Sequence, residues 1–320
     1  MINFAIIGLG GWGKRLVASV QGKSDHVQFS RAVTRTPSKV EDFAAEHHLA
    51  LGDEIGPALD DAALDGIVVA GPAQLHAEVA TQVLAAGKHV MVIKPLALYR
   101  ADAEALRDEA ESKGLVLAMG HDRCFLPAID ELRQRVAAGD LGRIVHAEGN
   151  FCVDRYFGLP EGDWKSDDAT SPPGSLAGHM LYTMIELLGP VETVSVQANH
   201  VAAPVNISDT AAVSLRFASG ATGGLTAIGV TPIFQRLHVF GTEGWAEIRN
   251  GRRLEFSPLK GESTVSDFPP ADLLRCQLES FAAAILGDKP YPVSPEDAVA
   301  GVAALEAMMR SAANGAVERV

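Results

Sequence analysis

Closely spaced glycines near the start of the chain have the pattern of a phosphate-binding turn. The apolar run Ile2–Ile7 is followed by the sequence GLGGWG at residues 8–13. In this pattern Gly8 permits a tight turn, Gly10 lets the backbone approach a diphosphate, and Gly13 allows a helix to pack close to a strand. The N–H groups at the start of that helix then attract the anion. We therefore expect a dinucleotide cofactor to bind at Gly8, Gly10, Gly11, Trp12 and Gly13.

The residues after the second apolar run, Val27–Val33, indicate which cofactor binds. Enzymes that use NAD commonly carry Asp or Glu at this position, where the carboxylate bonds the ribose 2′-hydroxyl. This chain has Thr34 and Arg35 instead, and a guanidinium suits a 2′-phosphate and can stack on adenine. Ser38 and Lys39 lie close enough in sequence to assist. We therefore predict NADP as the cofactor, with NAD as the alternative.

Residues 1–120 alternate between short apolar runs and segments of helical period. The runs lack strict polar alternation, which is typical of strands covered on both faces. They are Ile2–Ile7, Val27–Val33, Gly66–Ala70, His89–Ile93 and Leu115–Met119. Helices are expected between them, at Trp12–Gln21, Val40–His47, Leu75–Ala86 and Ala101–Ser112. This repeating order predicts a doubly wound parallel sheet, which is the Rossmann arrangement.

The pattern changes after residue 120, where apolar and polar residues begin to alternate. Val213, Leu215 and Phe217 are separated by polar residues, and such alternation predicts an antiparallel sheet with one buried face. Helices are expected at Pro127–Ala138, Ser175–Leu188, Asp272–Leu286 and Pro295–Ala313. We therefore expect an α/β protein with a Rossmann domain at residues 1–120. A second α/β domain with an open, mostly antiparallel sheet is expected at residues 121–320.

The composition excludes several classes of function. The chain has 320 residues and a net charge of −13, and an acidic surface repels nucleic acids and anionic membranes. The opening residues lack the basic region of a signal peptide, and no apolar run is long enough to span a bilayer. Cys124, Cys152 and Cys276 are isolated, which is typical of free thiols in a reducing compartment. We expect a cytoplasmic protein without a metal.

Several longer motifs carry a resemblance to a known family. They are AGKHVMVIKPLA at residues 86–97, GHDR at 120–123 with Phe125 and Pro127, GDLG at 139–142, FGTEG at 240–244, and the helix Pro295–Gly315. On these residues the chain resembles the glucose-fructose oxidoreductase / inositol dehydrogenase / MocA family over nearly its whole length. The resemblance implies hydride transfer between nicotinamide and a sugar, cyclitol or related alcohol or carbonyl. It also implies a homodimer or homotetramer formed through the second domain's sheet.

Lys94 matches the active-site lysine of that family. It follows the fourth expected strand, at the carboxyl edge where ligands bind in such sheets. An ammonium group there hydrogen-bonds the substrate oxygen and stabilises developing negative charge, and it also contacts the cofactor. The glutamate that usually precedes this lysine is Ile93 here, which removes a carboxylate from the site.

His179 is the candidate general acid and base, because an imidazole exchanges protons near neutral pH. The number of residues from His179 to Gly189 is the same as that between the corresponding histidine and glycine in the family. The family's usual aspartates four residues before and three residues after this histidine are Ser175 and Tyr182 here. Tyr182 lies about one helical turn from His179 and could share the proton.

Other residues complete the predicted site. His76 fits a family position near the cofactor, Arg123 could bind a carboxylate or hydroxyls of the substrate, and Trp164 could stack on a sugar face. A loop acid could replace the missing aspartates, and the candidates are Asp163, Asp167 and Asp168.

Two classes of function follow from these residues. The first is an NADP-dependent oxidoreductase in which Lys94 polarises the substrate oxygen and His179, with or without Tyr182, handles the proton. The second is a regulatory protein of the same fold that binds nucleotide and ligand with reduced catalysis, which the absent acids at positions 93, 175 and 182 favour. A redox-neutral enzyme that retains its cofactor through turnover is a third alternative.

Overall fold

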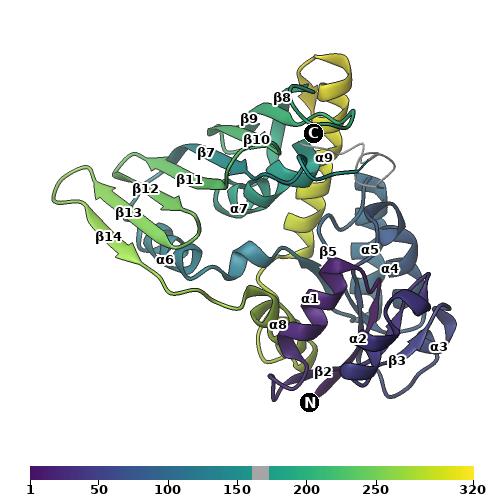
Figure 1. Ribbon diagram of the computed structural model, residues 1–320. Helices are drawn as coiled ribbons and strands as arrows, with labels where there is room; N and C mark the ends of the chain where they lie inside the picture. Colours follow the sequence, from purple (N-terminus) through teal and green to yellow (C-terminus); the bar gives the residue numbers. More distant parts are fainter. Residues whose placement is uncertain (161–172) are drawn as a thin grey trace. The chain divides into compact units, whose positions relative to one another are not determined.

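The structure is a computed structural model that describes residues 1–160 and 173–320. These residues form two compact units (Figure 1). The first contains Met1–Asp122 together with Asp272–Val302, and the second contains Arg123–Ala271 together with Ala303–Val320. We expected residues 121–320 to form the second domain alone, so the segment Asp272–Val302 departs from that expectation.

The first unit is built on a six-stranded parallel sheet with the order β3-β2-β1-β4-β5-β6. Its strands are β1 (Ile2–Ile7), β2 (Val27–Val33), β3 (Ala50–Gly52), β4 (Gly66–Val69), β5 (His89–Ile93) and β6 (Leu117–Gly120). Its first helices are α1 (Gly11–Val20), α2 (Glu41–Glu46), α3 (Gly56–Leu59), α4 (His76–Ala85) and α5 (Arg100–Lys113). The Rossmann arrangement is therefore confirmed. The strand β3 and the helix α3 were missed because three or four residues are too short to show a period.

The helix α8 (Leu273–Leu286) joins the first unit through its apolar face. Phe281 stacks on Phe4 of β1 with ring centroids 5.0 Å apart, and both side chains are fully buried. The Ser24 hydroxyl also donates to a Glu279 carboxylate oxygen at 2.8 Å. Burial of this face against α1 and β2 explains why a segment distant in sequence belongs to the Rossmann unit.

The second unit contains a nine-stranded sheet with the order β14-β13-β12-β11-β7-β10-β9-β8-β15. Its strands are β7 (Ile144–Cys152), β8 (Val191–Asn199), β9 (Thr210–Phe217), β10 (Thr222–Ile228), β11 (Phe234–Gly241), β12 (Gly244–Arg249), β13 (Arg253–Pro258), β14 (Thr264–Asp267) and β15 (Glu318–Arg319). Only β7 and β10 pair in parallel among these strands, so the expected mostly antiparallel sheet is confirmed.

One face of this sheet is buried and the other is open. Val213, Leu215 and Phe217 are buried, whereas Ser214 and Arg216 between them are exposed, as the alternation predicted. The helices α6 (Pro127–Ala138) and α7 (Gly178–Leu188) cover the buried face, with α7 on β7 and α6 on β12 and β13 (Figure 1). Gly149 of β7 leaves the space that Met180 and Met184 of α7 fill.

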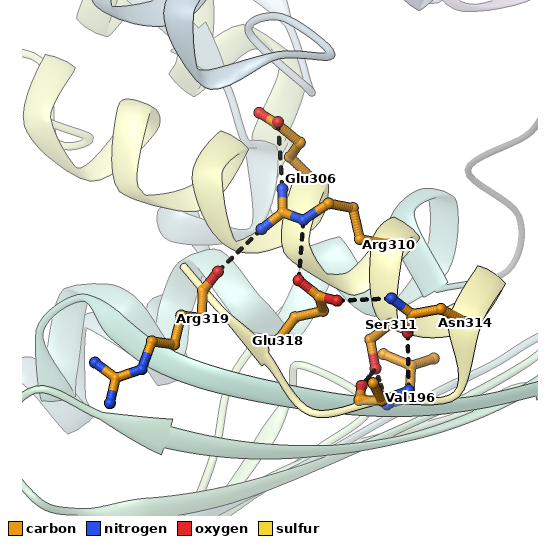
Figure 2. A network of polar contacts seen from close by, with 8 residues as sticks. Val196, Glu306, Arg310, Ser311, Asn314, Glu318 and Arg319 are labelled. Atoms are coloured by element: carbon orange, nitrogen blue, oxygen red, sulfur yellow. Dashed lines mark hydrogen bonds and ion pairs between the residues drawn. The ribbon is translucent and has the colours of Figure 1, made fainter.

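The chain's last residues are bound to this sheet through the helix α9 (Pro295–Asn314). Arg310 contacts Glu318 at 3.1 Å and donates to the Arg319 carbonyl oxygen at 2.9 Å. The buried Ser311 hydroxyl accepts from the Val196 N–H at 2.9 Å and donates to the Ala316 carbonyl oxygen at 2.6 Å (Figure 2). These contacts connect α9 and β15 to β8. In the part of the chain that the structure describes, no helix is long and apolar enough to cross a membrane.

Candidate active site

The glycine turn between β1 and α1 combines two positions that must be glycine with two that face open space. Gly8 has φ +100°, and a Cβ there would lie 2.6 Å from Gly71 N, while a Cβ on Gly13 would collide with the Gly8 carbonyl group. A Cβ on Gly10 or Gly11 would meet no atom within 4 Å. The backbone N–H groups at the start of α1 are therefore accessible, and the turn fits the diphosphate of a dinucleotide.

Further residues predicted to bind the cofactor lie in the first turn of α1 and after β2. Trp12 is in the first turn of α1, with the Arg15 guanidinium carbon 4.7 Å from its ring centroid. Thr34 follows β2 and donates its N–H to the Gly52 carbonyl oxygen at 2.9 Å. Arg35 is exposed, and no carboxylate occupies positions 34 to 36. The end of β2 thus presents a cation to a cofactor bound along this edge.

Lys94 lies at the same carboxyl edge, directly after β5. Its N–H donates to the Gly120 carbonyl oxygen at 3.3 Å, which attaches the residue to the end of β6. The preceding Ile93 confirms that no carboxylate adjoins the lysine in the strand. Because the sheet is parallel, the glycine turn after β1, Arg35 after β2 and Lys94 after β5 all follow carboxyl ends of strands in one sheet.

His76 at the start of α4 is buried, with 1% of its surface exposed. Its Nδ1 lies 2.7 Å from the Pro95 carbonyl oxygen, and its Nε2 lies 2.9 Å from the Gly71 carbonyl oxygen. Burial lowers the pKa of this imidazole, the two carbonyl oxygens oppose that shift, and the Lys94 charge adds to it. Both ring nitrogens therefore contact backbone of this chain, so His76 connects loops at the cofactor edge. Direct contact with the cofactor stays a prediction.

Two further basic residues of the 86–97 motif have structural roles. Lys88 is buried, with 8% of its surface exposed. Its ammonium group donates to the Asp61 and Leu64 carbonyl oxygens at 2.7 and 3.0 Å. The His89 Nδ1 accepts from the Val116 N–H at 2.9 Å. Both residues hold the amino end of β5, which leaves Lys94 as the cation that this motif presents at the carboxyl end.

In the second unit, His179 and Arg123 are brought together by a residue that we did not predict. Phe151 of β7 stacks on the His179 imidazole with ring centroids 4.4 Å apart and an interplanar angle of 18°. The Arg123 guanidinium carbon lies 4.8 Å from the centroid of the same phenyl ring. No sequence signal separated Phe151 from the other inward-facing residues of its strand.

Tyr182 is a buried phenol. Its side chain lies in the second unit, where burial raises the pKa of the phenol. The hydroxyl therefore stays protonated at neutral pH and can donate a hydrogen bond but not act as a base, and proton exchange with His179 stays a prediction. Ser175, at the other position of a missing aspartate, has its hydroxyl 3.1 Å from the Tyr156 hydroxyl.

The remaining predicted residues fall elsewhere. Trp164 and the loop acids Asp163, Asp167 and Asp168 lie outside the described residues. Among residues 1–160 and 173–320, no cluster of His, Cys, Asp and Glu could hold a metal ion. The described groups are thus a cofactor edge with Lys94 in the first unit and an imidazole–phenyl–guanidinium cluster in the second.

The fold and these groups define a class of protein in which a Rossmann unit with a dinucleotide-binding turn is joined to a second unit with a mostly antiparallel sheet. Residues 2–121 match the family described as "Oxidoreductase family, NAD-binding Rossmann fold", and residues 129–247 match "GFO/IDH/MocA C-terminal domain". The chain belongs to this Gfo/Idh/MocA family, and the resemblance noted in its sequence is confirmed.

Similar proteins include several named dehydrogenases. The chain is 29% identical to the 4-carboxy-2-hydroxymuconate-6-semialdehyde dehydrogenase of Sphingobium sp. (strain NBRC 103272 / SYK-6), over 64% of this chain and 64% of that protein. This alignment spans less than two thirds of that relative. The chain is 24% identical to the scyllo-inositol 2-dehydrogenase (NAD(+)) of Bacillus subtilis (strain 168), over 98% of this chain and 95% of that one. Among solved structures, GenD2 from gentamicin A biosynthesis, in complex with NAD, is 26% identical with a TM-score of 0.85 and covers 100% of this chain and 96% of its own.

Proposed function

We propose that this protein is an NADP-dependent dehydrogenase or reductase that acts on a hydroxyl or carbonyl group of a sugar, cyclitol or related small molecule. The observation that carries the proposal is the shared carboxyl edge of the Rossmann sheet, which holds both the open glycine turn and Lys94. The names of the similar dehydrogenases support the substrate class, and Arg35 supports the 2′-phosphate of NADP.

Each residue has a defined part in this reaction. The turn at Gly10 and Gly11 binds the diphosphate through backbone N–H groups, and nicotinamide, when bound, supplies or accepts the hydride. The Lys94 ammonium group hydrogen-bonds the substrate oxygen and stabilises negative charge that develops there. His179 takes the hydroxyl proton in the oxidative direction and returns it in the reductive direction.

A coupled assay tests the proposal directly. Purified protein is mixed with NADP+ or NAD+ and a panel of polyols, aldoses and cyclitols, and the absorbance of reduced nicotinamide is followed; the reverse reaction uses ketoses. We expect turnover with at least one sugar-like substrate and a higher kcat/KM with NADP. Binding of both cofactors without turnover on any substrate would contradict the enzyme proposal.

The regulatory alternative has its own observation. Ile93, Ser175 and Tyr182 stand where the family usually has acids, and the Tyr182 phenol is buried. Stopped-flow mixing of cofactor-loaded protein with candidate sugars separates the two functions. A sugar-dependent change in protein fluorescence without any change in nicotinamide oxidation state would favour a sensor.

We also propose that the protein is cytoplasmic and forms a homodimer or homotetramer through the open face of its second sheet. This face has a polar hollow of about 420 Å³ between β7, β8, β9, β10 and β11. Arg236 pairs with Glu148 there. A second copy supplies complementary groups to such a face. Light scattering on wild type and Arg236→Glu tests this, since a monomeric wild type would contradict it.

A further inference from the structure

In the second unit, four side chains contact one another around a pair of residues that face each other on neighbouring strands. Phe151 of β7 and Gln235 of β11 are register partners in the antiparallel pair. The Gln235 side-chain oxygen accepts from Arg123 Nη2 at 2.6 Å, and the Arg123 guanidinium carbon lies 4.8 Å from the Phe151 ring centroid. The His179 imidazole of α7 stacks on the same phenyl ring. One phenyl ring therefore contacts two of the second-domain residues that the sequence analysis selected, Arg123 and His179.

We infer that Phe151 is a positioning residue that holds the His179 imidazole in one orientation for proton exchange with the substrate. This inference rests on the proposed function. An imidazole rotates readily about its Cβ–Cγ bond, because this torsion is broad and has no sharp rotamers. A nearly parallel phenyl ring with its centroid 4.4 Å away restricts that rotation by favouring one ring plane.

The phenyl ring is itself held firmly. Phe151 is 7% exposed and lies near the carboxyl end of β7, where the strand pairs with both β10 and β11. Arg123 is fixed over the ring by the hydrogen bond to Gln235. The orientation of the imidazole therefore depends on a contact between a strand and a helix that are distant in sequence, supported by a third segment.

The same sheet contains a matched site that lacks the histidine. Phe256 of β13 is also 7% exposed, and the Arg135 guanidinium carbon lies 4.5 Å from its ring centroid. Phe256→Leu therefore removes a phenyl ring of equal burial with an arginine over it. Comparing Phe151→Leu with Phe256→Leu isolates the contact with His179 from the general loss of core volume.

The experiment measures the imidazole and the reaction separately. Selective histidine labelling gives the ring-proton resonances, and a His179→Gln variant assigns those of His179. In Phe151→Leu we expect these resonances to lose the ring-current shift, and kcat to fall roughly tenfold to a hundredfold, since small misplacement of a reacting group has effects of this size. The KM for the cofactor should be unchanged. Phe256→Leu should leave both the His179 resonances and kcat at wild-type values, and Phe151→Tyr, which keeps the ring, should restore kcat.

Each outcome decides the inference. Equal kcat in Phe151→Leu and Phe256→Leu, or unchanged His179 resonances in Phe151→Leu, would overturn it. If Phe151→Leu does not fold, Phe151→Met gives the same comparison, because its unbranched, flexible side chain fills an irregular space more readily. If wild type shows no turnover with any substrate, the proposed function fails and a catalytic positioning role fails with it, whereas the resonance shift still decides whether Phe151 holds the imidazole.

Discussion

The Nδ1 atom of His76 lies 2.7 Å from the carbonyl oxygen of Pro95, the residue that follows the candidate catalytic Lys94. The Nε2 atom of the same ring lies 2.9 Å from the Gly71 carbonyl oxygen, one peptide beyond the Ala70–Gly71 peptide that faces Gly8. One buried imidazole therefore connects the loop after β4, which supports the glycine turn, with the segment that carries Lys94. A neutral imidazole has a single N–H and donates to only one of these two carbonyl groups.

The first prediction concerns acid stability. Burial lowers the pKa of His76 below 6.5, so the unfolded chain binds a proton more readily than the folded one. The free energy of unfolding should therefore fall as the pH is lowered through about 6.5, and the loss should level off below the folded-state pKa. Urea denaturation across this pH range measures the slope. His76→Gln should make it shallower, while the exposed His26 provides the control variant His26→Gln. An equal slope in wild type and His76→Gln would count against the buried imidazole as its source.

The second prediction separates the two lysines of one motif. Lys94→Met should lose roughly 10² to 10³ in kcat, because the group that stabilises charge on the substrate oxygen is gone, and it should also bind cofactor more weakly because it loses a contact there. Lys88→Met should keep kcat and lose about 1–3 kcal/mol of stability, since two carbonyl groups lose a buried donor. Cofactor titration, steady-state kinetics and urea denaturation on both variants test this. Equal kcat losses would show that the motif acts through stability alone.

The third prediction concerns cofactor choice. Arg35→Asp should reduce the affinity for NADP at least tenfold and leave or improve that for NAD, because a carboxylate repels the 2′-phosphate and bonds a 2′-hydroxyl. Calorimetric titration with both nucleotides measures the ratio of the two affinities. Arg252→Asp in the second unit makes the same charge change and should not alter that ratio. A ratio unchanged in Arg35→Asp would show that Arg35 does not contact the 2′-phosphate.

The fourth prediction concerns the attachment of the C-terminal strand (Figure 2). Ser311→Ala leaves the Val196 N–H without its acceptor and should cost about 1–3 kcal/mol of stability. Ser112, whose exposed hydroxyl donates to the Glu109 carbonyl oxygen within α5, gives the control variant Ser112→Ala, which should cost less than about 0.5 kcal/mol. Thermal unfolding measures both. A stable Ser311→Ala would mean that water replaces the serine hydroxyl at Val196.

The spacing of apolar residues along the chain predicted the helices and strands that are long enough for a repeating pattern to be visible. The alternation at Val213, Leu215 and Phe217 identified β9, and the mostly apolar run at residues 2–7 identified β1. The elements β3, β14 and β15 were missed because they contain too few residues for a pattern. The division of the chain was wrong at α8, because the helical period of Phe281 shows that it is buried but not against which sheet.

The features of the candidate site also divide into those that local sequence predicts and those that depend on contacts between distant segments. The glycine turn and Lys94 were predictable because backbone geometry and position after a strand follow from local sequence. The burial of His76 and the structural use of Lys88 were not, since both depend on carbonyl groups of other loops. Tyr182 shared a helical turn with His179, yet its environment keeps the phenol protonated.

The amino-acid sequence by itself determined the Rossmann order, the position of the diphosphate turn and the absence of acids at residues 93, 175 and 182, because these depend on residue type and short-range period. Tertiary structure alone decided that Phe151 meets His179 and that His76 joins the loops at Gly71 and Pro95. The reason is physical: such contacts join segments far apart along the chain, and sheet register and helix packing, rather than local sequence, select them.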